Sequence, residues 1–137
     1  PEKPYEALSY NYGFWCYSWQ DEDLVYALTK TVHESYDAYK GATVDLPNWN
    51  LDCALDVIGL PYPYHAGSVR YFKDIGKWTP ELEKWNQRQL KVQDEIVKAW
   101  KPAQEEAKAQ GIEIPGESFG EWDEFWYDIV MKIIAGE

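Results

Sequence analysis

The densest group of chemically capable side chains lies in residues 63–76, where a histidine, an arginine and two tyrosines follow a rigid, proline-bearing turn. We expect a short helix here, with His65 near its N-terminus, where free backbone N–H groups favour an anion. Arg70 and Lys73 are three residues apart and would share one face of that helix. Two interpretations stay open. The corner either recognises a carboxylate or anchors the chain to another domain, or it is a capped helix whose arginine pairs with an acid such as Asp74.

The rest of the sequence carries no catalytic signature. It contains no phosphate-binding loop, nucleophile elbow, zinc-binding helix or dinucleotide fingerprint. The acid pairs Asp52/Asp56 and Glu117/Glu121 have helical spacing, which is typical of a solvated helix face in so acidic a chain. His33 is expected to be a surface or half-buried histidine. We therefore expect no enzymatic activity, no metal site and no cofactor.

The charge of the chain excludes several classes of partner. Among 137 residues, 24 are Asp or Glu and 13 are Lys or Arg, which gives a formal net charge of −11. Such a surface repels phosphate, so binding to nucleic acid or to an anionic membrane is disfavoured. The longest apolar stretches are too short to cross a bilayer. Cys16 and Cys53 match no metal-binding spacing, and they are compatible with one disulfide or with two separate thiols.

The N-terminal part of the sequence suggests a piece of a longer polypeptide. The segment Tyr5–Trp19 alternates with a period of two and is rich in β-favouring aromatic residues, which predicts one strand. A lone strand cannot satisfy its own backbone, and no second convincing strand follows, so we expect the rest of the sheet to come from elsewhere. The chain also begins at Pro1, and its only methionine is Met131. We expect the polypeptide to be processed from a longer precursor.

Helices are predicted for most of the remainder. Residues 21–40 have an apolar stripe at four-residue spacing, with Ser18 or Asp21 as the cap and Gly41 as the stop. Shorter helices are expected within 47–58 and 65–76. A long helix should begin at Thr79 and Pro80, with a kink or weakening near Pro102. The last helix should follow a capping box formed by Ser118 and Glu121.

The two C-terminal helices each present an apolar face. The seam of the first consists of Leu82, Trp85, Gln89, Val92, Ile96, Ala99 and Ala103, and the face of the second of Trp122, Phe125, Trp126, Ile129 and Ile133. Helices joined by a short loop most simply pack antiparallel and bury such faces. The rival interpretation is that one aromatic face stays exposed and docks a permease or a second copy of the protein.

Two segments together resemble a known family. The segment Asp23–Lys30 reads D-L-V-Y-A-L-T-K, and the segment Leu60–Tyr71 reads L-P-Y-P-Y-H-A-G-S-V-R-Y. They are similar to the C-terminal end of TAXI-type solute receptors, the periplasmic binding subunits of tripartite ATP-independent (TRAP) transporters. The resemblance covers residues 5–76.

The resemblance implies a fold, a location and a set of partners. This chain would be mostly α with one N-terminal strand, as a segment of a two-lobed α/β, type II-like periplasmic binding protein. Residues 1–76 would form the C-terminal segment of the solute-binding core and pack on the first lobe, and residues 77–137 a helical extension. The receptor would be periplasmic or otherwise extracytoplasmic. It would bind a small carboxylate or amino acid and deliver it to a TRAP membrane permease, with no role for nucleic acid.

The site residues follow from the same resemblance. Candidate ligand contacts are Tyr12, Tyr64, His65 and Arg70, and structural motif residues are Gly67 and Tyr71. If the block anchors the chain, Arg70 should be partly buried and paired with an acid or with backbone carbonyls. The alternative function is a stand-alone helical interaction module with tryptophan-rich docking faces.

Overall fold

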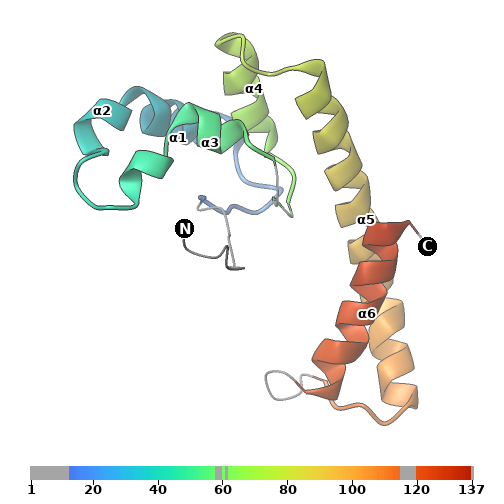
Figure 1. Cartoon of the computed structure of the whole chain (residues 1–137). Coiled ribbons are helices and arrows are strands. Elements are labelled where there is room, and N and C mark those ends of the chain that lie inside the picture. Colours follow the sequence, from blue (N-terminus) through green and yellow to red (C-terminus); the bar gives the residue numbers. More distant parts are fainter. Residues whose placement is uncertain (1–12, 58–59, 61, 115–119, 137) are drawn as a thin grey trace, which may run out of the picture. The chain divides into compact units, whose positions relative to one another are not determined.

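The computed structural model describes residues 13–57, 60, 62–114 and 120–136 (Figure 1). Helices account for the regular structure in these ranges, and no strand occurs among them. The chain divides between Asn86 and Gln87 into two compact units, which are described separately below. The first unit therefore extends ten residues beyond Gly76, where the sequence placed the end of the first domain.

The predicted strand Tyr5–Trp19 is wrong in the part that can be tested. Its residues up to Tyr12 lie outside the described residues, and Gly13–Trp19 form an irregular segment that ends in a turn. Four large rings of this segment are between 62% and 77% exposed, namely Phe14, Trp15, Tyr17 and Trp19. A strand needs a paired neighbour for its backbone groups, and the described part of the chain offers none. The alternation of aromatic residues was therefore not a sufficient signal.

Helix α1 (Glu22–Glu34) begins where the cap predicts. The Asp21 carboxylate accepts a hydrogen bond of 2.8 Å from the backbone N–H of Leu24, and two acids occupy the first turn, where the helix dipole favours negative charge. The chain pauses at Ser35 and continues as the short helix α2 (Tyr36–Tyr39). The predicted helix over residues 21–40 is thus confirmed, with one interruption.

The next predicted helix is shorter than expected. A 3-10 turn, η1 (Leu46–Asn48), precedes helix α3 (Leu51–Leu55), which is capped by the side chain of Asn50. Asp56 adopts an extended backbone conformation and ends the helix. Cys53 in α3 and Cys16 are both exposed free thiols, so the structure contains no disulfide between them.

Helix α4 (Ala66–Asp74) packs against α1 and forms the centre of the first unit. Its end is set by Gly76, which adopts a φ of 68°. Glycine tolerates this left-handed conformation, as the sequence predicted for the end of this helix. Among the described residues of this unit, the buried apolar side chains are Val25 of α1 and Tyr71 and Phe72 of α4.

Helix α5 (Pro80–Ala109) begins at the predicted signal. The Thr79 hydroxyl accepts a hydrogen bond of 3.2 Å from the backbone N–H of Leu82. The helix contains Pro102 and continues to Ala109, so the proline does not end it. A helix interior accepts proline only with the loss of one backbone hydrogen bond.

Helix α6 (Glu121–Ala135) starts by a different cap from the predicted one. Gly120 is the N-cap, and its backbone N–H donates to the Asp123 carboxylate over 3.1 Å. Ser118, the predicted cap, lies outside the described residues. Gly136, with a φ of 82°, ends the helix.

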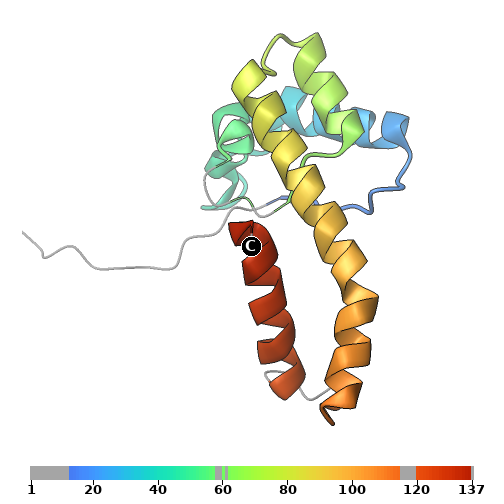
Figure 2. The same cartoon turned by 90° about the vertical axis from the view of Figure 1, so that its right-hand side faces the viewer.

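The second unit is a helical hairpin, in which α6 runs antiparallel to the second half of α5 (Figures 1 and 2). Its core is formed by Ala103, Ala107 and Trp122, with Ile112, Ile114, Phe125, Trp126 and Ile129 packed around them. The ring of Trp100 lies 5.5 Å from that of Trp122 and 4.9 Å from that of Trp126.

Antiparallel packing is therefore confirmed, and the predicted seam on α5 is confirmed at Ala103, its C-terminal end. The core contacts of α5 are confined to this end of the helix, at Trp100, Ala103 and Ala107. The reason is length, since α6 has 15 residues and can cover only the nearer half of the 30-residue α5. Trp85, which the sequence assigned to this seam, packs in the first unit instead, 5.8 Å from the ring of Tyr64. No helix among the described residues has both the length and the apolar character needed to span a membrane.

Candidate functional site

The helix crossing between α1 and α4 is organised by a close approach at Gly67. A Cβ atom on this residue would lie 2.4 Å from the Glu22 carbonyl oxygen, 2.7 Å from the Tyr26 nitrogen and 2.9 Å from the Val25 Cβ. Distances this short exclude any side chain larger than hydrogen. Gly67 is therefore the position that lets the two helices touch backbone to backbone, which fits its predicted role as a structural motif residue.

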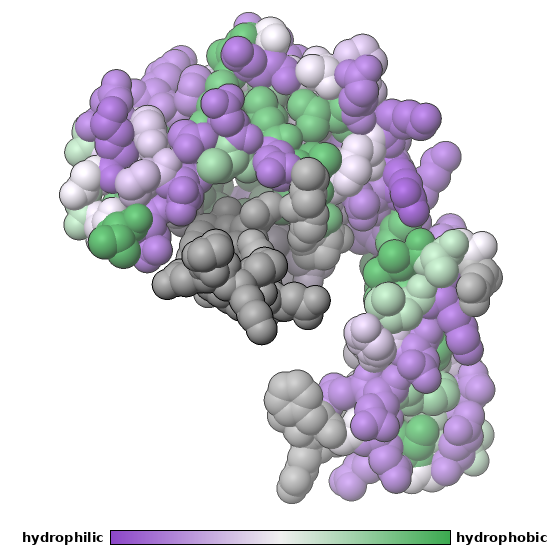
Figure 3. Space-filling model, viewed as in Figure 1, coloured by the Kyte–Doolittle hydropathy of each residue, from purple (hydrophilic) through white to green (hydrophobic). Residues whose placement is uncertain are grey.

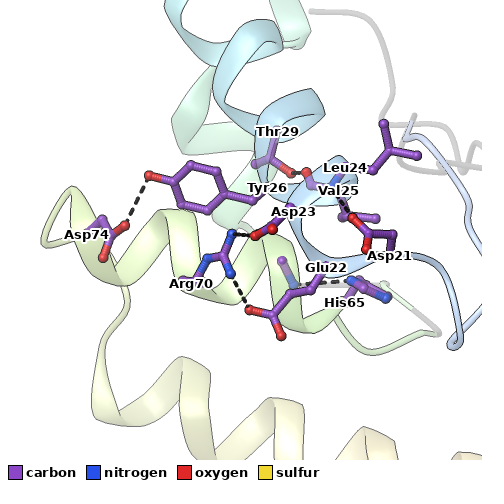
Figure 4. A network of polar contacts seen from close by, with 11 residues as sticks. Asp21, Glu22, Asp23, Leu24, Val25, Tyr26, Thr29, His65, Arg70 and Asp74 are labelled. Carbon is purple, nitrogen blue, oxygen red and sulfur yellow. Dashed lines mark hydrogen bonds and ion pairs between the residues drawn. The ribbon is translucent and has the colours of Figure 1, made fainter.

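Arg70 joins the two helices one turn beyond that contact (Figure 4). Its Nη1 atom donates to Glu22 Oε1 over 2.8 Å, and its Nη2 atom donates to Asp23 Oδ1 over 2.6 Å. The hydrogen bond to Asp23 and the nearby carboxylates raise the pKa of the guanidinium above its usual value. The side chain is 40% exposed, so the pairing occurs at the rim of the crossing. The predicted pairing with an acid is confirmed, with the acids supplied by α1.

Tyr26 completes the rim of the crossing. Its ring lies under the Arg70 guanidinium, 4.5 Å from the ring centre to Cζ, a distance at which a cation is attracted to the face of the ring. Its hydroxyl donates to Asp74 Oδ2 over 3.0 Å, and this hydrogen bond is the main cause that raises the pKa of Tyr26. Asp74, which the sequence offered as the partner of Arg70, is thus engaged by a tyrosine instead.

His65 caps the N-terminus of α4. The sequence predicted that free backbone N–H groups at this N-terminus would favour an anion. The His65 Nδ1 atom accepts a hydrogen bond of 3.1 Å from the backbone N–H of Gly67. The acceptor role requires Nδ1 to be unprotonated. The imidazole therefore occupies one of the free N–H groups that an anion would use.

Three further polar contacts lie within α1 or between α1 and α4. The Thr29 hydroxyl donates to the Val25 carbonyl over 2.8 Å and lies 2.9 Å from the Ser68 hydroxyl, which is left as the donor of that pair. The hydroxyl of Tyr71 lies 2.6 Å from His33 Nδ1. Tyr71 is only 2% exposed, and burial raises the pKa of its phenol. A buried hydroxyl of this kind needs such a partner, so His33 has a structural role here.

Tyr64 belongs to a separate aromatic cluster of the first unit. Its hydroxyl donates to the carbonyl of Ala54, and its backbone N–H donates to the buried side-chain amide of Asn86 over 2.7 Å. Burial raises the pKa of Tyr64 to about 12. The rings of Phe72, Trp78 and Trp85 surround it with centroid distances of 5.5 to 5.8 Å.

The four candidate ligand contacts are not brought into one cluster. Tyr12 lies outside the described residues. Tyr64 faces the aromatic cluster, whereas His65 and Arg70 contact the α1–α4 crossing. No group of three or more histidine, cysteine or acidic side chains suited to a metal ion occurs in the described ranges. As predictions of ligand contacts, these residues remain untested.

Sequence reasoning missed the acids that hold Arg70. As acids in the first turn of a helix, Glu22 and Asp23 carry no sequence signal that points to Arg70. Their pairing with Arg70 joins residues 47 and 48 positions apart, which only the crossing of two helices brings together. A usable signal existed, because Arg70 follows the buried Gly67 by three residues and so lies on the same side of α4.

The model of the NMT1-like family matches residues 2–76. The chain belongs to the NMT1-like family. This is a periplasmic binding-type family related to solute-binding proteins, and membership indicates a solute-binding role and an extracellular location at a coarse level. Among curated proteins and among solved structures, comparison finds no match. The NMT1-like match ends at Gly76, directly after α4, so it includes both helices of the crossing and neither α5 nor α6.

Proposed function

We propose that this chain is part of an extracytoplasmic receptor of the TAXI type, which binds a small organic anion or amino acid and delivers it to a TRAP-type membrane permease. In this proposal the chain catalyses no reaction and needs no cofactor. Its partners are the upstream lobes of the receptor, the carboxylate-type ligand and the permease subunits. The compartment is the periplasm or its extracytoplasmic equivalent.

The observation that carries the proposal is the pairing of the two segments that resemble solute receptors. Asp23–Lys30 lies in α1 and Leu60–Tyr71 leads into α4, and these helices form the glycine-mediated crossing. Residues far apart in the sequence thus serve one compact element inside the NMT1-like match. This supports a shared structural role for both segments in a solute-binding core.

The partners of Arg70 favour an anchoring role over direct ligand contact. A ligand carboxylate would have to compete with Glu22 and Asp23, which already hold both terminal nitrogens. The two roles predict different results for Arg70→Gln in the receptor expressed from its complete reading frame. If Arg70 anchors the chain, the variant should melt at a lower temperature but bind its ligand with unchanged affinity at temperatures well below that melting point. If Arg70 contacts the ligand, the variant should bind more weakly and keep its melting temperature.

The function itself is tested by calorimetric titration of that receptor. The ligand panel contains small mono- and dicarboxylates and amino acids, with neutral sugars of similar size as the control. We expect saturable binding of at least one carboxylate or amino acid and none of the sugars. Uptake of the same ligand in vesicles that contain the permease then tests delivery. A receptor that binds no member of the anionic and amino-acid panel contradicts the proposal.

The second candidate, a stand-alone interaction module, is favoured by the exposed rings of residues 14–19. The rings of Tyr17 and Trp19 stack with their centres 4.4 Å apart. Both rings are exposed, and a protein partner would cover their apolar area. The intact mass of the native gene product separates the two. A precursor of at least about twice this length with a signal peptide supports the receptor, and an independent product near 16.0 kDa supports the module.

A further inference from the structure

The chain turns sharply after α4 and stays close to this helix. The backbone N–H of Gly76 donates to the Lys73 carbonyl over 3.0 Å, and that of Lys77 donates to the Phe72 carbonyl over 2.8 Å, which is the pattern of a Schellman motif. The backbone N–H of Trp78 also donates to the Phe72 carbonyl, over 3.2 Å. The residues that follow the helix are thereby held against its last turn.

Trp78 joins the end of α4 to the start of α5. Its ring lies parallel to that of Phe72, with 6.3 Å between the ring centres. Its Nε1–H donates to Glu83 Oε2 over 2.7 Å, and the same oxygen lies 3.0 Å from the Lys73 ammonium. One carboxylate of α5 thus holds both the indole of the turn and a cation at the end of α4. Figure 3 shows apolar side chains gathered between α4 and the start of α5.

Asn86 makes a contact at the other end of α4. Its side chain is 4% exposed, and its Oδ1 atom accepts a hydrogen bond of 2.7 Å from the backbone N–H of Tyr64. Tyr64 directly precedes His65, the N-cap of α4. Because Asn86 is buried, water cannot easily replace it, and the Tyr64 N–H would lose its acceptor if the amide were removed.

Aromatic rings fill the space between these two ends. The ring of Tyr64 lies 5.5 Å from that of Trp78 and 5.8 Å from that of Trp85, with both pairs in edge-to-face geometry. The ring of Phe72 lies 5.8 Å from that of Tyr64 on the α4 side. This is a favoured geometry for aromatic pairs, and it buries apolar area. The polar contacts at the two ends of α4 are therefore linked by continuous ring packing.

We propose that residues 77–86 form a clasp that holds α4 at both ends and keeps it in the orientation that the α1–α4 crossing requires. The clasp contacts Phe72 and Lys73 at the end of the helix and Tyr64 just before its start. Gly67 and Arg70 lie between these points, so their contacts with α1 depend on where the clasp sets α4.

The clasp makes the start of α5 a working part of the first unit. The NMT1-like match ends at Gly76, before any residue of the clasp. A simple linker between two units would not bury an amide against the first of them, whereas Asn86 does so and is its last residue. The proposal goes beyond solute binding, since it concerns no ligand and only residues outside the family match.

Native-state hydrogen exchange of the full chain tests the clasp. Asn86→Leu keeps a side chain of similar size but removes the acceptor of the Tyr64 N–H. We expect the α4 amides to exchange about tenfold faster or more, because a buried N–H without an acceptor favours local opening. The α6 amides should keep their rates. Lys84→Leu, at an exposed position two residues earlier in the same helix, is the control and should leave both helices unchanged.

Trp78→Phe gives a milder perturbation, in case Asn86→Leu unfolds the whole first unit. It keeps an aromatic ring beside Phe72 but removes the Nε1–H that Glu83 accepts. The α4 amides should then exchange severalfold faster, again without a change in α6. Exchange of α4 at the wild-type rate in either variant overturns the proposal. Equal acceleration in α6, or in α4 of Lys84→Leu, overturns it as well, because the loss of stability is then not specific to the clasp.

Discussion

The α1–α4 crossing and the α5–α6 hairpin solve the same problem of joining two helices by different means. In the crossing, a glycine brings backbones together, and specific polar pairs such as Arg70 with Glu22 hold the helices. In the hairpin, small alanines and tryptophan rings fill the space, and the core is apolar. The crossing thus depends on particular residues at particular positions, whereas the hairpin depends on apolar periodicity that many sequences satisfy. The family match includes the first and not the second.

The largest expected effect tests the apolar hairpin. Trp122 lies in the core of the hairpin and is 7% exposed. Trp122→Ala should therefore leave a cavity and lower the free energy of unfolding of the second unit by roughly 3–5 kcal/mol. Trp126→Ala, at a half-buried ring, should cost less. Hydrogen exchange of the α6 amides measures both. Trp19→Ala removes an exposed ring of the same type and serves as the control, and an equal loss there would contradict the assignment of the core.

The next effect tests the backbone contact of the crossing. Gly67→Ala forces a Cβ against the backbone of α1 and should destabilise the first unit by about 3 kcal/mol, the upper range for overpacking. Urea unfolding followed by circular dichroism measures the change. Gly41→Ala is the matched control, since nothing lies within 4 Å of its new Cβ. If the two variants unfold alike, the helices do not touch at Gly67.

A pH dependence tests the aromatic cluster of the first unit through Tyr64. Burial raises the pKa of Tyr64 from 10.0 to about 12, so the folded state keeps its proton where the unfolded state loses it. The stability from this group is present below pH 10 and is lost as the pH rises from 10 through 12, by at most about 2.7 kcal/mol. Tyr64→Phe should flatten the fall in stability over this range. An unchanged slope would mean that Tyr64 ionises normally.

The smallest effect tests the charged rim of the crossing. Arg70→Ala removes the pairs with Glu22 and Asp23 and the contact with Tyr26, but the side chain is 40% exposed and water can solvate the acids. We expect a fall in melting temperature smaller than that of Gly67→Ala, which shrinks at high salt because ions screen exposed pairs. Lys30→Ala, in a longer surface pair with Glu34, should change the melting temperature less still. A fall that is independent of salt would indicate lost ring packing as its cause.

Sequence alone predicted the elements that have local signals. Caps at Asp21 and Thr79 and the stop at Gly76 are recognisable within one helical turn, and they placed α1, α5 and α4 correctly. The predictions that failed relied on patterns that are not specific, or on contacts between residues far apart in the sequence. Alternation in residues 13–19 cannot distinguish a paired strand from an exposed irregular segment, because pairing depends on a partner elsewhere.

The candidate site shows the same division. An acid partner for Arg70 could be predicted from its charge, and a cap was expected near His65 from the helix start. The sequence could not predict which acid pairs with Arg70. Nor could it predict that the imidazole of His65 would itself be the cap. Both depend on the angle and register at which α1 crosses α4, and these are set by the space that Gly67 leaves open.

The span of chain between the two crossing helices has a consequence for the order of folding. Arg70 meets Glu22 across 48 positions, whereas the hairpin joins Trp100 to Trp122 through a shorter loop. Closing a loop costs entropy that grows slowly with its length, about 0.6 kcal/mol for each doubling, and this cost is met before any contact is gained. The hairpin should therefore appear first after dilution from denaturant, and the crossing should be the slower event. In hydrogen exchange pulsed at successive times during refolding, the Gly67 amide should therefore stay unprotected for longer than the amides of α6.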